Sequence, residues 1–352
     1  MSFVKVLCDW LSLSRGMMDS LNVLLTKRFV NSDIDYLRSS VDGLDFFQPC
    51  WSDESALFEY INSIGVGIDV VMGPPPPKNI LVNLKKTLKY IQIPWAGVDS
   101  IQLSDCRELE IPVANSHGNS TSVAEMAVAL LLSIAKLIPF HDAELRKGRW
   151  HRPNSSDGFY PPKRIHGVTV GFFGYGAINK SISKLVQGFG VKTIACSNSL
   201  VDVEYVDESY LVDDGFFEFL KKADYVIIAA PLTDKTRFLF NSKAFKAMKK
   251  SSYLINVSRG GIVCDASLFT ALIEKQIAGA AIDTWNVSPP GNDTSKSVST
   301  YNFDELDNVV MSPHRAGFIE EELPHLIDVV DNFRRLKLGR PLINLIDFNK
   351  GY

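Results

Sequence analysis

Short apolar runs alternate with amphipathic segments along most of the chain. Apolar residues recur at helical spacing from Ile80 to Leu88 and from Ser181 to Phe189, and the runs between such segments are short and continuous. This alternation is typical of parallel sheets covered by helices on both faces. The predicted strands are Val4–Leu7, Val66–Met72, Tyr90–Ile93, Ile111–Ala114, Val168–Phe173, Val191–Cys196, Tyr225–Ala230, Leu254–Val257, Ala278–Ile282 and Val309–Met311.

The most apolar segment of the chain is Val123 to Phe140. It contains Glu125 and Lys136 and ends near Pro139. We therefore predict a buried helix rather than a membrane span. Because this helix is apolar on most sides, it is suited to contact a second subunit as well as its own sheet. The polar segment Trp150–Pro162 is predicted to be a surface loop.

A glycine turn follows the predicted strand Val168–Phe173. Gly174 permits a sharp turn, and Gly176 lets a pyrophosphate approach the backbone at the start of the next helix. The third glycine of the usual G-x-G-x-x-G pattern is Asn179, a position that normally serves helix–strand packing rather than phosphate contact. Strand, turn and helix together predict a dinucleotide-binding site, with the N–H groups at the helix start facing the phosphates.

The end of the next strand bears on which dinucleotide is bound. NAD-binding folds usually place a carboxylate there for the ribose 2′-OH. This chain has Ser197 and Asn198, with neither an acid nor an arginine beside them. The cofactor is therefore predicted to be NAD or NADP, and the absence of a repelling acid slightly favours NADP.

Chemically useful residues follow the remaining strands. Arg259 can hold a carboxylate and a carbonyl in one fork, and His314 is suited to protonate a carbonyl as hydride arrives. In a parallel sheet these strand ends meet along one edge. Nearer the N-terminus, the loop Gly73–Pro77 is equally consistent with a ligand loop and a stiff turn. Backbone N–H groups of Ile93–Asp99 can hold an anion, although spacing alone favours a plain turn there.

Composition narrows the class of protein. A chain of 352 residues suggests two domains, and a net charge of −3 gives no reason to expect a nucleic-acid or membrane partner. The five cysteines are scattered without a C-x-x-C pair, so we expect neither a disulfide framework nor a metal site. With no signal-peptide pattern at the N-terminus, a cytoplasmic protein with reduced thiols is predicted.

These motifs, taken in order, resemble the D-isomer-specific 2-hydroxyacid dehydrogenase family over nearly the whole chain. The matching segments are Gly97-Val98-Asp99, Ser122-Val123-Ala124-Glu125, Arg146-Lys147-Gly148-Arg149-Trp150, the glycine turn, Pro231-Leu232-Thr233 with Thr236, Asn256–Gly261, Ala280–Asp283 and Pro313–Gly317.

The resemblance implies a fold of two doubly wound parallel-sheet domains. A Rossmann coenzyme domain, residues 115–314, is inserted into a flavodoxin-like substrate domain made of residues 1–114 and 315–352, with the substrate in the cleft. It implies a homodimer formed through the coenzyme domain.

The resemblance also implies roles for individual residues. Arg259 orients a small 2-oxo or 2-hydroxy acid and His314 exchanges the proton, while Trp95, Ala96 and Gly97 form the substrate-carboxylate loop. Asp283 is expected at the nicotinamide carboxamide. The implied cofactor-binding residues are Gly174, Tyr175, Gly176, Ala177, Ile178, Ser197, Asn198, Ala230, Pro231, Thr236, Val257, Ser258, Asp283 and Gly317.

One departure from the family pattern concerns the catalytic histidine. The family pairs this histidine with a glutamate, and the corresponding position here is Ser288. Because a serine carries no charge, we expect His314 to have a lower pKa than in its relatives, unless Glu320 or Glu321 takes the glutamate's place. The alternative function is an NAD(P)H-binding sensor with little turnover, although a protein that only binds has little reason to keep both Arg259 and His314.

Overall fold

The computed structural model describes residues 20–49, 54–150, 161–200, 202–287, 297–320 and 323–352. It divides into two compact units. Unit 1 contains the described residues up to Asn119 and from Glu320 to Tyr352, and unit 2 contains those from Ser120 to Ile319. The chain changes unit five residues later at each crossing than the sequence-based boundaries at 114 and 314.

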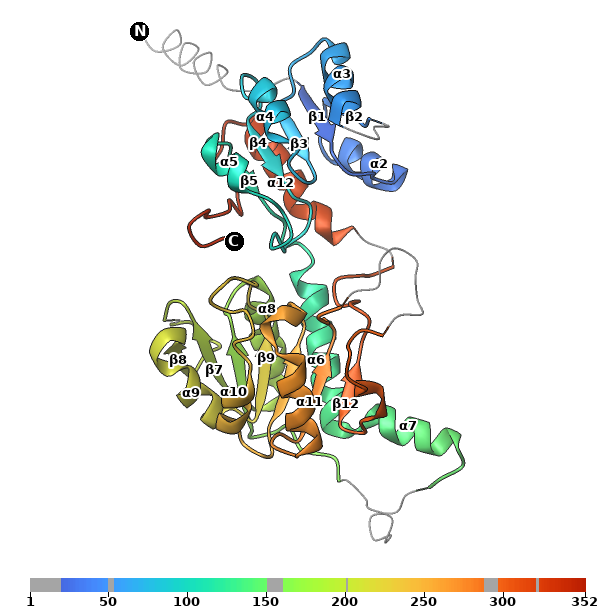
Figure 1. Cartoon of the computed structure of the whole chain (residues 1–352), viewed down its shortest axis with the longest axis vertical. Helices are drawn as coiled ribbons and strands as arrows, with labels where there is room; N and C mark the ends of the chain where they lie inside the picture. Colours follow the sequence, from blue (N-terminus) through green and yellow to red (C-terminus); the bar gives the residue numbers. More distant parts are fainter. Residues whose placement is uncertain (1–19, 50–53, 151–160, 201, 288–296, 321–322) are drawn as a thin grey trace, which may run out of the picture. The chain divides into compact units, whose positions relative to one another are not determined.

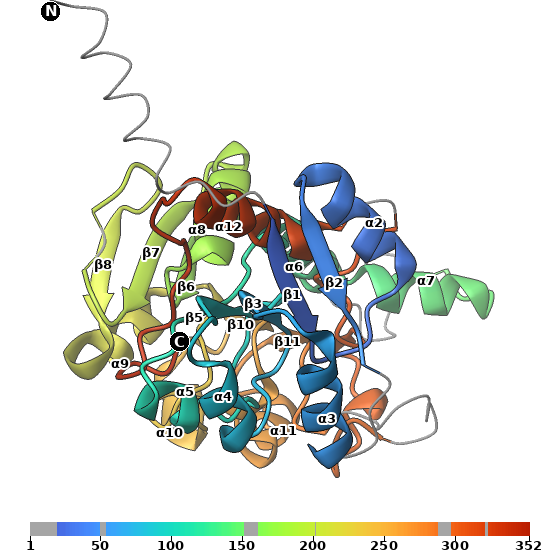
Figure 2. The same ribbon diagram turned by 90° about the horizontal axis from the view of Figure 1, so that it is seen from above.

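Unit 1 is a five-stranded sheet in the order β2-β1-β3-β4-β5, with every strand pair parallel. This order is that of a flavodoxin-like fold, and Figure 2 shows β1 and β2 side by side. Apolar clusters cover both faces of the sheet. The elements are β1 (Leu21–Leu25), α2 (Asn31–Ser40), β2 (Leu44–Phe47), α3 (Glu54–Ile64), β3 (Val70–Met72), α4 (Lys78–Leu84), β4 (Tyr90–Gln92), α5 (Ser104–Glu108), β5 (Val113–Ala114) and α12 (Ile327–Lys337).

The C-terminal segment completes unit 1. Helix α12 packs Val329, Val330 and Phe333 into the same apolar cluster as β1 and β3. Beyond it, Leu345 forms an antiparallel bridge with Ala114 at the open edge of β5. The core of unit 1 therefore draws on both ends of the chain.

Unit 2 is a seven-stranded parallel sheet in the order β12-β11-β10-β9-β6-β7-β8, drawn in the lower half of Figure 1. The order reverses between β6 and β9, the point where doubly wound sheets bind ligands. Apolar clusters again cover both faces. Its strands are β6 (Thr169–Phe173), β7 (Lys192–Ser197), β8 (Glu208–Leu211), β9 (Tyr225–Ile228), β10 (Tyr253–Asn256), β11 (Gly279–Ile282) and β12 (Val309–Met311). Its helices are α6 (Ser120–Lys136), α7 (Ile138–Arg146), α8 (Ala177–Val186), α9 (Val212–Lys222), α10 (Ser242–Ala247) and α11 (Asp265–Ile273).

The long apolar segment forms two helices rather than one. Leu137 adopts a left-handed conformation, with φ of 53°, and separates α6 from α7 with a bend of 60°. Among the described residues no single helix is long and apolar enough to cross a membrane, and the bent pair α6–α7 meets those two requirements only when its halves are counted together.

Three strands were not predicted from the sequence. These are β1, β2 and the edge strand β8, whose side chains are half-buried or exposed and so form no continuous apolar run. The predicted strand Val4–Leu7 lies outside the described residues. The other predicted strands are present, although β3 begins at Val70 rather than Val66.

Candidate functional site

The glycine turn after β6 has the conformation that dinucleotide binding requires. Gly174 has a φ of +77°, and a Cβ there would lie 2.8 Å from the Cα of Ala230, so the turn lies directly against the end of β9. At Gly176, by contrast, a Cβ would meet no heavy atom within 4 Å. Lys180 N–H to Gly176 O is a 3.0 Å bond that opens α8, which leaves the N–H groups of Ala177 and Ile178 without intrahelical acceptors. Open space, free donors and a helix N-terminus fit a pyrophosphate.

The side chain of Asn179 stabilises this turn through hydrogen bonds. Its side chain is fully buried, and its Nδ2 donates to the carbonyl oxygens of Phe173, at 3.2 Å, and Gly174. Its Oδ1 has no partner among the described residues. The residue that replaces the third glycine therefore braces the turn, at the cost of one unpaired buried acceptor. From the sequence, this position was expected only to serve helix–strand packing.

The side chains of several predicted cofactor residues form hydrogen bonds within their own loops. The Thr236 hydroxyl donates to Pro231 O at 2.7 Å and accepts from the Thr233 N–H at 2.9 Å. The Ser258 hydroxyl donates to Ala230 O, and the Tyr175 hydroxyl lies 2.8 Å from that of Ser183. These contacts fix the loops after β9, β10 and β6.

The remaining predicted cofactor residues lie at strand ends along the same edge. The last residue of β7 is Ser197, so a hydroxyl rather than a carboxylate ends this strand. That hydroxyl donates to Ser199 O. Asn198 follows it, Val257 follows β10, and Gly317 lies in the segment after β12. Their contacts with a cofactor stay predictions.

Arg259 follows β10 in extended backbone. Its carbonyl accepts from the Asn256 side chain at 3.0 Å, and its own guanidinium donates to Ser258 O at 2.9 Å. Asn256 Oδ1 also accepts from the Ser258 N–H at 3.1 Å. A fully buried amide at the end of β10 thus fixes the turn that carries the arginine.

His314 is held in a turn that a buried carboxylate organises. Asp283 is fully buried at the end of β11, and its backbone oxygen accepts from the His314 N–H at 2.8 Å. Its Oδ1 accepts from the Ser312 hydroxyl and from the Arg315 N–H at 2.9 Å, and its Oδ2 accepts from the Ala316 N–H at 3.1 Å. His314 itself has a φ of 56°, a conformation that side-chain-bearing residues adopt only when their surroundings impose it.

This bonding gives Asp283 a role that its motif did not reveal. The sequence prediction placed it at the nicotinamide carboxamide, and that contact stays a prediction. In the structure, its carboxylate orients the turn that presents the exposed His314 side chain. No sequence pattern links Asp283 to Arg315, 32 residues later, because the pairing of β11 with β12 brings the two together.

In unit 1, the loop after β4 presents two backbone donors. Trp95 O accepts from the Ser116 N–H at 3.2 Å, and Ala96 O accepts from Asn115 Nδ2 at 2.7 Å. The described residues contain no cis peptide bond, and in a trans peptide C=O and N–H point in opposite directions. The N–H groups of Ala96 and Gly97 therefore point away from the segment 115–116.

These two N–H groups are available to a ligand. Within the described part of unit 1, neither bonds to any acceptor, and both residues are only half-buried. Adjacent free N–H groups form an anion-binding nest. Beside them, Lys27 Nζ lies 4.8 Å from the centre of the Trp95 ring. These donors are consistent with the predicted carboxylate loop, and its contact with a substrate stays a prediction.

The residue at the family's glutamate position, and one of its two possible substitutes, are not among the described residues. Ser288 and Glu321 lie outside the described residues, and Glu320 is exposed. The expected lower pKa of His314 therefore stays a prediction. Among the described residues, no group of three or more His, Cys, Asp or Glu side chains is placed to hold a metal ion.

Comparison with known proteins agrees with this geometry. Residues 128–316 match the family described as "D-isomer specific 2-hydroxyacid dehydrogenase, NAD binding domain". The chain is 31% identical to the glyoxylate reductase of Thermococcus litoralis over 86% of its own length and 87% of that protein's. It is 32% identical over 68% of its length to the D-3-phosphoglycerate dehydrogenase of Methanocaldococcus jannaschii, but it spans only 44% of that relative.

A solved structure extends the likeness to the fold. The D-isomer specific 2-hydroxyacid dehydrogenase from Xanthobacter autotrophicus Py2, in complex with NADPH and MES, has a TM-score of 0.75 and 24% identity. The match covers 95% of this chain and all of that one.

Fold, site and comparisons define an oxidoreductase built on a nicotinamide-dinucleotide-binding sheet. The chain belongs to the D-isomer specific 2-hydroxyacid dehydrogenase family, whose members depend on NAD(P). The comparisons give no support to the alternative of a cofactor-binding sensor.

Proposed function

We propose that this protein catalyses NAD(P)-dependent interconversion of a small 2-oxo acid and the corresponding D-2-hydroxy acid. The observation that carries the proposal is the order of groups along the carboxyl edge of unit 2. The strands β7, β6, β9, β10, β11 and β12 are consecutive neighbours in the sheet. Ser197 ends β7, and the other five strands are followed in this order by the glycine turn, Ala230, Arg259, Asp283 and His314. This order runs from the predicted adenosine end through the pyrophosphate turn to the proton donor.

Each reacting group has a separate task in this proposal. The nicotinamide, when bound, supplies the hydride that reaches the substrate carbon. Arg259 holds the substrate carboxylate and polarises its carbonyl by a forked set of donors. His314 donates a proton to the carbonyl oxygen during reduction and accepts it back during oxidation. Two strand spacings, about 10 Å, separate β10 from β12, so both side chains start close enough to serve one small acid.

The choice of substrate and of cofactor belongs to the same proposal. The relative from Thermococcus litoralis is named for glyoxylate, and the nest at Ala96 and Gly97 is suited to a small carboxylate. Glyoxylate, hydroxypyruvate and pyruvate are therefore the first substrates to test. Ser197 at the end of β7 offers no carboxylate to exclude a 2′-phosphate, which favours NADP slightly.

The test measures oxidation of NADH or NADPH with this panel of 2-oxo acids, for the wild type and for His314→Ala and Arg259→Ala. We expect turnover by the wild type and a loss of about 10²- to 10⁴-fold in kcat for His314→Ala, the usual worth of a general acid. Cofactor binding, followed by fluorescence, should be unchanged in His314→Ala. A wild type that binds NAD(P)H tightly and turns over none of these acids would contradict the proposal.

We also propose a homodimer formed through unit 2. Helix α7 projects from the rest of this unit in both views (Figures 1 and 2). Around it Ile138, Leu145 and Trp150 are exposed to 54%, 56% and 76%, and apolar surface of this kind is suited to burial against a second subunit. Sedimentation velocity should give a dimer for the wild type and a monomer for Leu145→Asp, whereas a monomeric wild type would refute the dimer.

A further inference from the structure

The segment Asn115–Ser116, directly after β5, holds the carbonyl side of the candidate carboxylate loop. Asn115 contributes the only side chain among the described residues that bonds to the Ala96 carbonyl. Since this carbonyl and the Gly97 N–H share one trans peptide, the bond from Asn115 fixes the direction of the Gly97 donor. The orientation of a candidate ligand group therefore depends on a residue that does not contact the ligand.

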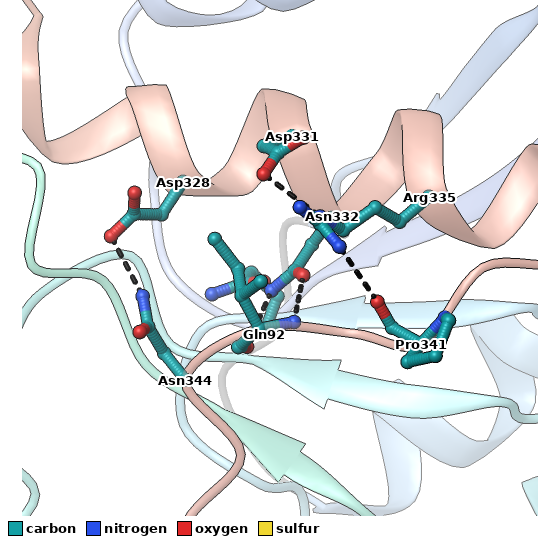
Figure 3. Close-up of polar contacts among 8 residues, drawn as sticks. Gln92, Asp328, Asp331, Asn332, Arg335, Pro341 and Asn344 are labelled. Carbon is teal, nitrogen blue, oxygen red and sulfur yellow. Dashed lines mark hydrogen bonds and ion pairs between the residues drawn. The ribbon is translucent and has the colours of Figure 1, made fainter.

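Asn115 is itself held by two hydrogen bonds of its backbone. Its side chain is 4% exposed, and its backbone N–H donates to Asn344 O at 3.1 Å. Its carbonyl accepts from Gln92 Nε2 at 3.3 Å. Asn344 in turn donates its side-chain amide to Asp328 on α12 at 2.9 Å, as Figure 3 shows. The loop is thus tied through Asn115 to the C-terminal segment.

Beneath α12, a pair of buried amides supports this arrangement. Asn332 Nδ2 donates to Gln92 Oε1 at 2.9 Å, and both residues are labelled in Figure 3. The same Nδ2 donates to Ile343 O at 3.2 Å, and Asn332 Oδ1 accepts from the Ile343 N–H at 2.8 Å. Both side chains are fully buried. Because each amide has both donor and acceptor partners, neither can flip without losing bonds.

We propose that Asn115 is a positioning residue for substrate binding: it aims the Gly97 N–H at the substrate carboxylate and so sets the affinity for the 2-oxo acid. This proposal rests on the proposed function only in taking the ligand to be such an acid. We expect an effect on binding alone. The hydrogen bond from the Gly97 N–H to the substrate carboxylate is the same before and after the substrate carbonyl is reduced. Loss of an interaction shared by ground state and transition state raises KM and leaves kcat unchanged.

The variant that tests this is Asn115→Ala, with Asn115→Asp as its isosteric partner. The aspartate keeps the backbone bonds to Asn344 and Gln92 but places a second acceptor against the Ala96 carbonyl. One lost hydrogen bond, with some freedom gained by the loop, should raise KM about 5- to 20-fold for the alanine. The aspartate should raise KM at least as much. In both variants kcat should change less than about twofold, and the Kd for NAD(P)H should be unchanged, since the candidate cofactor turn belongs to unit 2.

The matched control is Asn22→Ala. Asn22 is also in unit 1 and also donates Nδ2 to a backbone oxygen, that of Gly67, at 2.8 Å. Asn22 is the second residue of β1, near the amino end of that strand and not in the loop after β4, so loss of its bond should not alter KM. If Asn115→Ala does not fold, Asn115→Asp provides the same comparison. A wild-type KM in a folded Asn115→Asp variant would overturn the proposal.

A second readout separates this inference from the proposed function. In nuclear magnetic resonance spectra, oxamate should shift the backbone amide signals of Ala96 and Gly97 in the wild type. In Asn115→Asp the shift at Gly97 should require about 5- to 20-fold more oxamate. This experiment needs no turnover, so a catalytically silent wild type with these shifts would refute the activity and retain the role of Asn115. Equal titrations in both proteins would refute that role.

Discussion

The two units orient their candidate site groups by different chemistry. In unit 1, neutral amides direct backbone donors: Asn115 holds the Ala96 carbonyl, and Gln92 holds Asn115. In unit 2, the buried carboxylate of Asp283 holds the turn that presents His314. Hydrogen bonds to a charged group contribute about 1.5–3 kcal/mol, against about 0.5–1.5 kcal/mol between neutral groups. The strained backbone of His314 has the stronger support, whereas the unstrained loop of unit 1 is held by several weaker bonds.

The largest effect is expected at the glycine turn of unit 2. Gly174→Ala would combine a φ of +77° with a Cβ 2.8 Å from the Ala230 backbone, so we expect a loss of about 4 kcal/mol in the free energy of unfolding, measured in urea. Gly176→Ala is the control, because its Cβ meets no atom within 4 Å.

For Gly176→Ala we expect a change in unfolding free energy below about 0.5 kcal/mol, together with roughly tenfold weaker NAD(P)H binding. Equal destabilisation by the two alanines would show that the turn is not built as described. Undiminished cofactor affinity in Gly176→Ala would remove the pyrophosphate from this turn.

Asp283→Asn tests the charged support of His314. The amide cannot accept from the Ala316 N–H on the side that carries its NH₂, and the charge is lost, so unfolding free energy should fall by about 3 kcal/mol. Misplacement of His314 should lower kcat at least about tenfold.

The control for this variant is Asp224→Asn. Asp224 accepts from the Thr169 N–H at 2.9 Å, but it directly precedes β9 and so lies at the amino ends of the strands, away from the carboxyl ends that carry the candidate site. It should lower stability without changing kcat. A wild-type kcat in Asp283→Asn would show that the carboxylate does not position His314.

Asn332→Leu tests the neutral network of unit 1. It would leave the buried Gln92 Oε1 and the half-buried Ile343 N–H unpaired, which should cost about 2 kcal/mol in unfolding free energy. The exposed Asn83 serves as control, because its side-chain amide bonds to the exposed Asn62 alone among the residues that the structure describes. Asn83→Leu should cost less than about 0.5 kcal/mol. Similar costs for both leucines would mean that the buried network contributes little.

A smaller loss of stability is expected in unit 1 when the pH is lowered. Burial lowers the pKa of His117 below its ordinary 6.5, with Asp328 opposing, and burial lowers that of His325, with Asp33 opposing and Lys27 reinforcing. Below pH 6.5 the unfolded chain therefore binds more protons than the folded one. Stability that is complete above this pH is lost as the pH falls toward the folded pKa values.

Hydrogen exchange of β1 and β3 amides should accordingly be faster at about pH 5.5 than at pH 7, after correction for intrinsic rates. His117→Gln with His325→Gln should reduce this pH dependence. An unchanged dependence in the double variant would assign it to other groups.

How far the sequence could predict the molecule depends on whether a feature is local. Continuous apolar runs predicted the central strands of unit 2, and the Gly174–Gly176 spacing predicted the turn. Strand β8 was missed because an edge strand with exposed side chains has no apolar run. The predicted first strand, Val4–Leu7, lies outside the described residues, and β1, which pairs with β2 and β3, was missed.

For the site residues too, local features were predicted and non-local contacts were missed. Arg259 and His314 were predicted because they stand next to recognisable strand ends. Asn115, Gln92 and Asn332 were missed because isolated amides have no periodicity, and their partners lie far away in sequence. The support that Asp283 gives to His314 was missed for the same reason.

The most direct test of the proposed activity follows the hydride itself. The protein would be incubated with NADPH or NADH deuterated at C4 of the nicotinamide on the transferred face, together with pyruvate or hydroxypyruvate, and the product analysed by mass spectrometry and chiral chromatography. We expect a D-2-hydroxy acid carrying one deuterium at C2, and about 10²- to 10⁴-fold less labelled product from His314→Ala over the same time. A product of L configuration, or one without deuterium at C2, would contradict it.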